Sequence, residues 1–351
     1  MGNACHPAAV KFNVVANVLH NRLTHYSLIT IDKRETKERI FAFHNQIYIN
    51  CSMIYGRTEE PLENVNFTLP ATPESTINML AISKNDEPLK IYIGAPKWGE
   101  RSWKGIIYPK RAKDSELLTL YADSFKTIEF GATFYTISSA DKIQEWAQQV
   151  AGSPGFKFCP KFPQIITHAR RLNHTTKEFT EQFYNSLTGF GDHLGPLMMQ
   201  LSEHFSPKYY DVLKAYLETL DPAIPVHVEV RNKNWFADSV ERKRLFDLFR
   251  NLNIGTVISD TSGRRDVVHM ELTTNRAMIR FVGNDLAESD YKRLNDWIDR
   301  IKEWRDMGLK SLWFFMHQDN EKFVPQASSY FINHLNNKLG TDIALPKMIT
   351  E

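Results

Sequence analysis

The chain has 351 residues, of which 42% are hydrophobic and 24% charged, and its formal net charge is +2. This composition is typical of a soluble globular protein that can bury a large core without a disulfide framework. So small a net charge excludes bulk attraction to nucleic acid or membrane as the basis of function, and any electrostatic recognition must come from local clusters.

The first 89 residues show no regular alternation and are expected to form either a poorly ordered N-terminal extension or a small accessory region. Residues 39–55 have strand-like chemistry, and residues 57–90 form a polar, Pro-containing linker. No apolar run has the length of a signal peptide or a membrane span, and His6 stands where a myristoylation signal requires Ser or Thr. We therefore expect no membrane partner.

Cysteine usage indicates a reducing compartment. The three cysteines are far apart and match no metal-binding spacing: Cys5, Cys51 and Cys159. We expect neither disulfides nor a cysteine-bound metal, and we predict a cytoplasmic protein that needs no cofactor.

From residue 90 to residue 340, short strand-like runs alternate with amphipathic segments, as parallel βα units require. The expected strands are 91–96, 127–131, 156–161, 196–202, 226–231, 256–260, 278–283 and 311–317. The expected helices are 115–125, 139–150, 176–187, 207–220, 239–252, 288–308 and 325–339. Only the segment between Asp260 and Met278 lacks a clear helix.

Eight such units predict an α/β fold, a (β/α)8 TIM-type barrel over residues 90–340 followed by a tail at 341–351. An open doubly wound sheet usually has fewer strands and a Gly-rich first turn. Neither the dinucleotide-binding glycine motif nor the phosphate-binding loop motif occurs here. The open-sheet alternative is therefore rejected.

Function in such a barrel gathers where the strands end, and alternate side chains there point into the lumen. The valines of the run 226–230 suit packing against helices, which turns His227, Glu229 and Arg231 inward. We interpret the polar residues late in the other strands in the same way: Glu129, Lys161, Gln200, Asp260, Arg280 and His317.

Ionisable side chains are costly to bury unless they are paired, so this set has two interpretations. It forms either a self-satisfied ion network that plugs the barrel or a network organised around a ligand. The position of the charges late in the strands favours the ligand. Lys161 is then a proton donor or amine nucleophile, Glu129 and Glu229 are candidate general acid/base residues, and Arg231 and Arg280 hold an anion.

The loops after the strands add candidates for ligand binding. Aromatic side chains that can wall a pocket follow the first, second and fifth strands, namely Trp98, Tyr135 and Trp235. The third loop is basic and contains His168, so with Lys161 it is a candidate phosphate or carboxylate clamp. Gln200, Asp260 and His317 complete the predicted ligand-binding set.

The segment from about residue 91 to residue 340 resembles the YecE-like family, also called domain of unknown function 72. The resemblance rests on an ordered series of motifs: IYIG with W-x4-W-x-G-x2-YP, TIE followed by TFY, FKFCPKFPQIITH, LGPLMMQLSEHF, E-x-R-x3-WF, SDT and IRFVG. It implies a TIM-type barrel and supplies no activity. The chain departs from the family pattern at the mouth, at 95–98, 131–132, 231–235 and 316–318.

These residues lead us to expect a barrel whose mouth binds a small anionic ligand carrying phosphate or carboxylate. Whether it also catalyses a hydrolysis, isomerisation or lyase reaction stays open, as does its oligomeric state. A metal-dependent phosphoesterase- or isomerase-like site would use Glu129, Glu229, Asp260 and His317, although the nearby cations compete for these carboxylates. The third alternative is a non-catalytic protein that binds a small molecule or, less favoured, nucleic acid.

Overall fold

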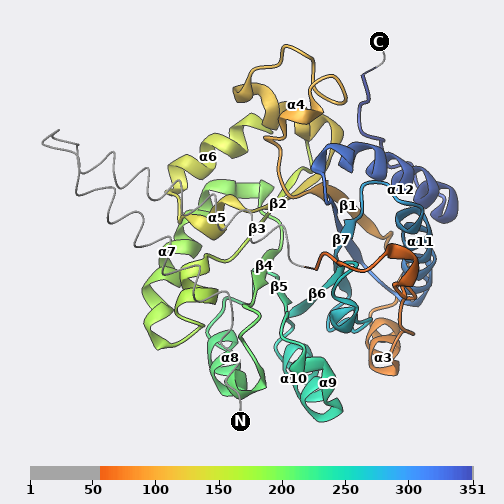
Figure 1. The fold of residues 1–351 in the computed structure, drawn as a ribbon. Coiled ribbons are helices and arrows are strands. Elements are labelled where there is room, and N and C mark those ends of the chain that lie inside the picture. The colour runs from red at the N-terminus through yellow and green to blue at the C-terminus, as the bar shows by residue number, and fades with distance from the viewer. Residues whose placement is uncertain (1–55, 350–351) are drawn as a thin grey trace, which may run out of the picture. The chain divides into compact units, whose positions relative to one another are not determined.

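A computed structural model describes residues 56–349, in which eight parallel strands are surrounded by helices (Figure 1). The strands are β1 (Lys90–Ala95), β2 (Thr127–Phe130), β3 (Lys157–Pro160), β4 (Leu197–Gln200), β5 (Val226–Glu229), β6 (Gly255–Asp260), β7 (Arg276–Gly283) and β8 (Ser311–Gln318). Every expected strand is present, and the predicted (β/α)8 fold is confirmed. Cys5, Cys51 and the strand-like run 39–55 lie outside the described residues.

The strand order is β3-β2-β1-β8-β7-β6-β5-β4, so β3 and β4 lie at the seam of the barrel. Two backbone hydrogen bonds connect the seam in place of a continuous ladder. Gly195 N–H donates to the Phe158 carbonyl at 2.7 Å, and Phe162 N–H donates to the Met198 carbonyl at 2.9 Å. The barrel is therefore nearly closed.

The seven helices expected from the sequence are all present. They are α4 (Leu117–Ser124), α6 (Ala140–Gln149), α7 (Lys177–Leu187), α8 (Tyr210–Leu217), α10 (Ser239–Asn251), α11 (Glu288–Met307) and α12 (Val324–Leu339). Two short helical turns, α5 (Ala132–Tyr135) and α9 (Asn234–Ala237), lie in loops after strands. No helix among residues 56–349 is both long and apolar enough to cross a membrane.

The connection between β6 and β7 holds only a short 3-10 turn, Arg265–Val267, and a helix from upstream packs beside it. This helix, α3 (Glu74–Ile82), lies against α11 (Figure 1). Thr76 Oγ1 donates to the Met270 carbonyl at 3.1 Å and accepts from Leu272 N–H at 2.8 Å, and Leu80 is fully buried. Residues before the barrel thus complete its ring of helices.

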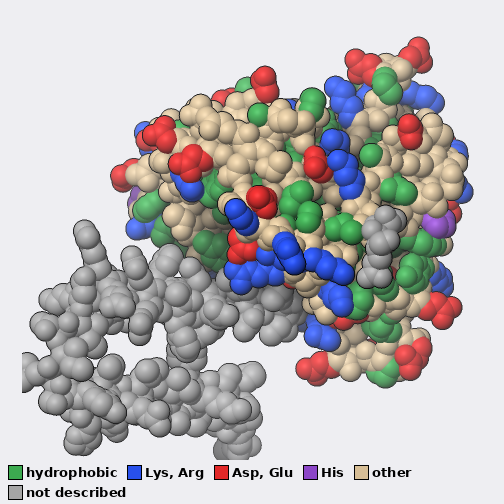
Figure 2. Space-filling model, turned by 90° about the horizontal axis from the view of Figure 1, so that it is seen from above, with side chains coloured by type: hydrophobic (Ala, Val, Ile, Leu, Met, Phe, Trp, Pro, Cys, Tyr) green, Lys and Arg blue, Asp and Glu red, His purple; other side chains and the backbone are tan. Residues whose placement is uncertain are grey.

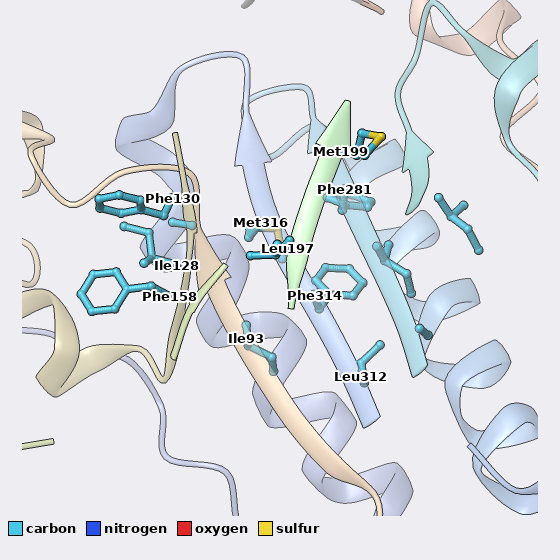
Figure 3. Close-up of a cluster of buried hydrophobic side chains, with 14 of the residues drawn as sticks. Ile93, Ile128, Phe130, Phe158, Leu197, Met199, Phe281, Leu312, Phe314 and Met316 are labelled. Carbon is cyan, nitrogen blue, oxygen red and sulfur yellow. The ribbon is translucent and has the colours of Figure 1, made fainter. Parts of the chain in front are cut away.

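Apolar side chains fill two regions of the barrel. Those that point outward from the strands pack under the helices, as Figure 3 shows for Ile93, Phe158 and Phe314 among others. A second cluster fills the lumen: Cys159, Met198, Val257, Met278, Trp313 and Phe315, with Tyr92 stacked on Trp313 at 4.0 Å between ring centroids. On the strands that form this lumenal plug, the polar lumenal residues lie two positions after a plug residue along the chain. Charged groups therefore occupy only the C-terminal half of the lumen.

Removing the buried leucine of α3 should destabilise the whole barrel. We expect Leu80→Ala to lower the free energy of unfolding by about 2–5 kcal/mol, because it leaves a cavity between α3 and the barrel wall. Ile82→Ala on the same helix is the matched control, since Ile82 is 88% exposed. Urea unfolding monitored by circular dichroism measures both, and equal small effects would show that α3 does not support the barrel.

Candidate functional site

Strand β2 places Glu129 in the lumen, where only 1% of its side chain is exposed. Its carboxylate accepts contacts from three cationic or imidazole groups. Lys161 Nζ lies 2.5 Å from Oε1, while Arg280 Nε and His317 Nε2 lie 2.7 and 3.0 Å from Oε2. Burial alone would raise the pKa of Glu129, but Arg280, Lys161 and His317 together hold it well below its usual range.

Glu229, at the end of β5, is the second buried carboxylate. It accepts from Arg231 Nε at 3.1 Å, from Arg280 Nη1 at 3.0 Å and from the Ser259 hydroxyl. Burial opposes ionisation, but the charges of Arg231 and Arg280 lower the pKa of Glu229 to about 2. The Arg280 guanidinium therefore bridges both carboxylates from β7.

The remaining donors of the lumen surround this bridge. Arg231 Nη2 donates to Gln200 Oε1 at 2.9 Å, which orients the Gln200 side chain so that its amide nitrogen carries the free N–H groups of that residue. The Lys161 side chain is 12% exposed. Burial lowers its pKa, although the charge of Glu129 opposes the shift.

Two histidines lie at the edge of the group. His317 contacts Glu129 through Nε2, and burial lowers its pKa although Glu129 opposes the shift. His168 lies in a π-helical turn, Ile165–Ala169, with Nδ1 2.8 Å from the Thr167 hydroxyl. Burial, with the nearby charge of Arg231, lowers the pKa of His168 to about 4, so this imidazole is neutral at pH 7.

Tyr135 is connected to the site by ring contacts, which run through Phe134 to His168. Its ring lies edge-on to Phe134 at 5.2 Å between centroids, and Phe134 lies edge-on to His168 at the same distance. These three rings form a wall beside the cationic side chains. The structure thus brings together Glu129, Lys161, Gln200, Glu229, Arg231, Arg280 and His317, with His168 and Tyr135 at the rim.

The structure does not bring Asp260, Trp98 or Trp235 into this group. Asp260 points away from the lumen, and its carboxylate binds Arg293 Nη2 at 3.0 Å and Trp297 Nε1 at 2.7 Å. These partners lie on α11, so Asp260 joins strand to helix.

The two tryptophans pack outside the lumen. Trp98 lies against the outward-facing Phe130, with 5.7 Å between ring centroids. Trp235 is fully buried, and its Nε1–H donates to the Phe205 carbonyl at 2.7 Å. Both side chains hold loops in place.

Two members of the site were not predicted from the sequence. Ser259 lies two residues after the lumenal Val257. Because alternate residues of a strand face the same side, this spacing would have predicted that Ser259 also faces the lumen. Glu321 lies in the 3-10 turn after β8, with Oε1 3.8 Å from His317 Nδ1. Strand periodicity does not apply to a loop residue, so the position of Glu321 could be seen only in the folded structure.

The geometry does not favour the metal-dependent alternative. Arg280 binds both Glu129 and Glu229, which are the carboxylates that such a site would use. Across residues 56–349, no three His, Cys, Asp or Glu side chains are grouped so that they could hold a metal ion.

Comparison with known proteins identifies the family. The model of the family "Protein of unknown function DUF72" matches residues 92–349, most of the chain. The protein belongs to the DUF72 family. It is 26% identical over 254 residues to the UPF0759 protein YecE of Escherichia coli K12, a match that covers 67% of this chain and 89% of YecE. The predicted YecE-like membership is confirmed.

Solved structures of DUF72 proteins show the same fold. A family member from Thermotoga maritima has a TM-score of 0.54 and 20% identity, with 72% of this chain and all of that chain covered. One from Enterococcus faecalis V583 has a TM-score of 0.54 and 17% identity, with 72% and 97% covered. At such identities the likeness concerns the fold alone, so function must be argued from the site.

Removing the bridging arginine should be strongly destabilising. We expect Arg280→Met to lower the free energy of unfolding by about 3–5 kcal/mol, because two buried carboxylates lose a shared partner. Arg101→Met is the control, since Arg101 is 76% exposed and its ion pair with Asp114 lies in solvent, where such pairs contribute little. Chemical denaturation measures both, and similar losses would contradict a central role for Arg280.

The lowered pKa values also predict acid sensitivity. An unfolded Glu has a pKa of about 4.3, and Glu129 and Glu229 both have a lower pKa in the fold, so both stabilise it above that pH. Glu229 loses this contribution as pH falls toward about 2. Glu229→Gln should lower stability at pH 6 and flatten its decline between pH 5 and pH 3. Glu145→Gln, at a side chain 60% exposed, should keep the wild-type slope. Urea midpoints at each pH provide the test, and an unchanged slope in Glu229→Gln would contradict it.

Proposed function

We propose that the mouth of the barrel binds a small anionic molecule that carries a phosphate or carboxylate group. The observation that carries this proposal is the position of Lys161. An ammonium group has three N–H donors, and among the described residues Glu129 is the one side chain that binds it. A ligand oxygen beside Lys161 would satisfy donors that the described protein groups leave available.

The surroundings of Lys161 suit an anion for two further reasons. The amide nitrogen of Gln200 is a second donor, held in orientation because Arg231 binds its oxygen. The carboxylates of Glu129 and Glu229 are already engaged by Arg280, so their charges are largely compensated. Because the apolar plug excludes water from below, charge-assisted hydrogen bonds to a ligand would be strengthened there.

Anion binding is better supported than acid/base catalysis by the glutamates. Glu129 and Glu229 are saturated with donors and ionised well below neutral pH, so in the resting site they anchor cations. A chemical step would rely on Lys161, whose buried amine suits proton donation or attack on a carbonyl carbon. We therefore propose a binding role first and assign any catalysis to Lys161.

The nucleic-acid alternative is less favoured because the basic helix α10 is neutralised by acidic partners. Lys243 binds Asp247 at 2.5 Å and Arg250 binds Glu271 at 2.6 Å. On the face shown in Figure 2, Lys and Arg side chains form a local group among acidic and neutral ones. Neither feature forms a long basic track of the kind that a nucleic-acid backbone requires.

The proposal predicts that inorganic phosphate raises the thermal stability of the protein through Lys161. We expect Lys161→Met to weaken phosphate binding at least about tenfold, because it removes a charge-assisted hydrogen bond. Lys157→Met is the matched control, since Lys157 begins β3, which Lys161 directly follows, but donates to the Asp192 carbonyl at the surface.

Thermal shift and isothermal titration at constant ionic strength measure the two variants. Wild-type affinity in Lys157→Met combined with loss in Lys161→Met supports the proposal. Equal affinity in all three proteins, or no stabilisation of the wild type by phosphate or by short carboxylates, would overturn it.

A further inference from the structure

Glu321 is a buried carboxyl that the proposed anion site does not yet use. Its side chain is 9% exposed, and Trp103 Nε1–H fixes its backbone by donating to its carbonyl at 2.7 Å. Its Oε1 lies 3.8 Å from His317 Nδ1, whereas its Oε2 has no hydrogen-bond partner among the described residues. A buried carboxylate without a cation would be costly, so the group needs another explanation.

The charges around Glu321 do not stabilise an ionised form. Lys97, in the loop after β1, pairs with Glu100 at 2.8 Å. Glu100 and Glu129 add negative charge from the β1 loop and from β2, while β8 contributes His317. Burial raises the pKa of Glu321 to about 8, and the charge of Lys97 does not overcome it. At neutral pH this carboxyl is therefore mainly protonated and can donate a hydrogen bond.

The neighbouring imidazole has a matching requirement. Glu129 is an ionised carboxylate and can only accept, so His317 Nε2 must carry the proton that faces it. In a neutral imidazole Nδ1 is then an acceptor, and it is the atom that faces Glu321. A shift of about 1 Å brings this pair to hydrogen-bond distance.

We infer that Glu321 is a positioning residue of the anion site: as a neutral acid it donates to His317 Nδ1, which keeps the Nε2–H directed at Glu129. The inference rests on the proposed function. It also explains how a third carboxyl can lie beside the site without repelling an anion. When Glu321 releases its proton to solvent, a negative charge appears beside His317 and anion binding weakens.

Sulfate is the probe that isolates this effect, because its charge is constant between pH 6 and pH 9.5. We expect wild-type affinity for sulfate to fall about tenfold as pH rises through about 8, the effect of one carboxylate charge at intermediate dielectric. Glu321→Gln keeps a neutral donor, and its affinity should stay flat over this range. Glu100→Gln, which removes a carboxylate whose pKa is lowered, should change affinity without changing its slope against pH.

A decline that persists in Glu321→Gln would assign the titration to Lys161 and overturn the inference. Infrared spectroscopy of the sulfate-free protein gives a second readout. A protonated-carboxyl band should disappear with a midpoint near pH 8 and be missing from Glu321→Gln. If sulfate, phosphate and short carboxylates all fail to bind the wild type, the proposed function fails, and the infrared band alone then decides whether Glu321 is a neutral acid. Absence of that band at pH 7 would overturn this inference.

Discussion

The bridge from Arg280 to Glu129 and Glu229 is the interaction on which the rest of the site depends. It joins β7 to β2 and β5, so one guanidinium fixes side chains from three separate parts of the barrel. In a water-poor lumen none of these three groups can be lost without leaving the others uncompensated. Lys161 and Arg231 then bind the same two carboxylates, and their positions follow from the bridge.

The apolar plug beneath the bridge makes this arrangement effective. On β3 and β7 a polar lumenal residue lies two positions after a plug residue, as Lys161 follows Cys159 and Arg280 follows Met278. The plug closes the N-terminal half of the barrel to water, so charges are strongly coupled and a ligand can approach only from the mouth. The helix α3 supports this wall from outside where the β6–β7 connection has no helix.

The sequence could predict whatever the period of a strand decides. His227, Glu229 and Arg231 share one face because their spacing is two, and the same rule identified Lys161 and Gln200. Asp260 was predicted to face the lumen because it ends a strand, and the alternation of side chains that starts at lumenal Val257 was not applied to it. In the structure Asp260 faces α11 and Ser259 faces the lumen. Glu321 and α3 could not be predicted, because loop geometry and long-range packing place them.

The three buried glutamates near the barrel mouth differ in how their charge is compensated, and this difference underlies the proposed anion site. Glu129 and Glu229 are ionised because Arg280 contacts both, and their lone pairs are occupied by protein donors. Glu321 has no Lys or Arg ion pair among the described residues, so burial raises its pKa to about 8, and we infer that its proton is directed at His317 Nδ1. Lys161 and the Gln200 amide are then the groups proposed to contact a ligand, and both donate hydrogen bonds. A ligand that supplied acceptors would complement them, and this is the basis of the proposed binding of an oxyanion.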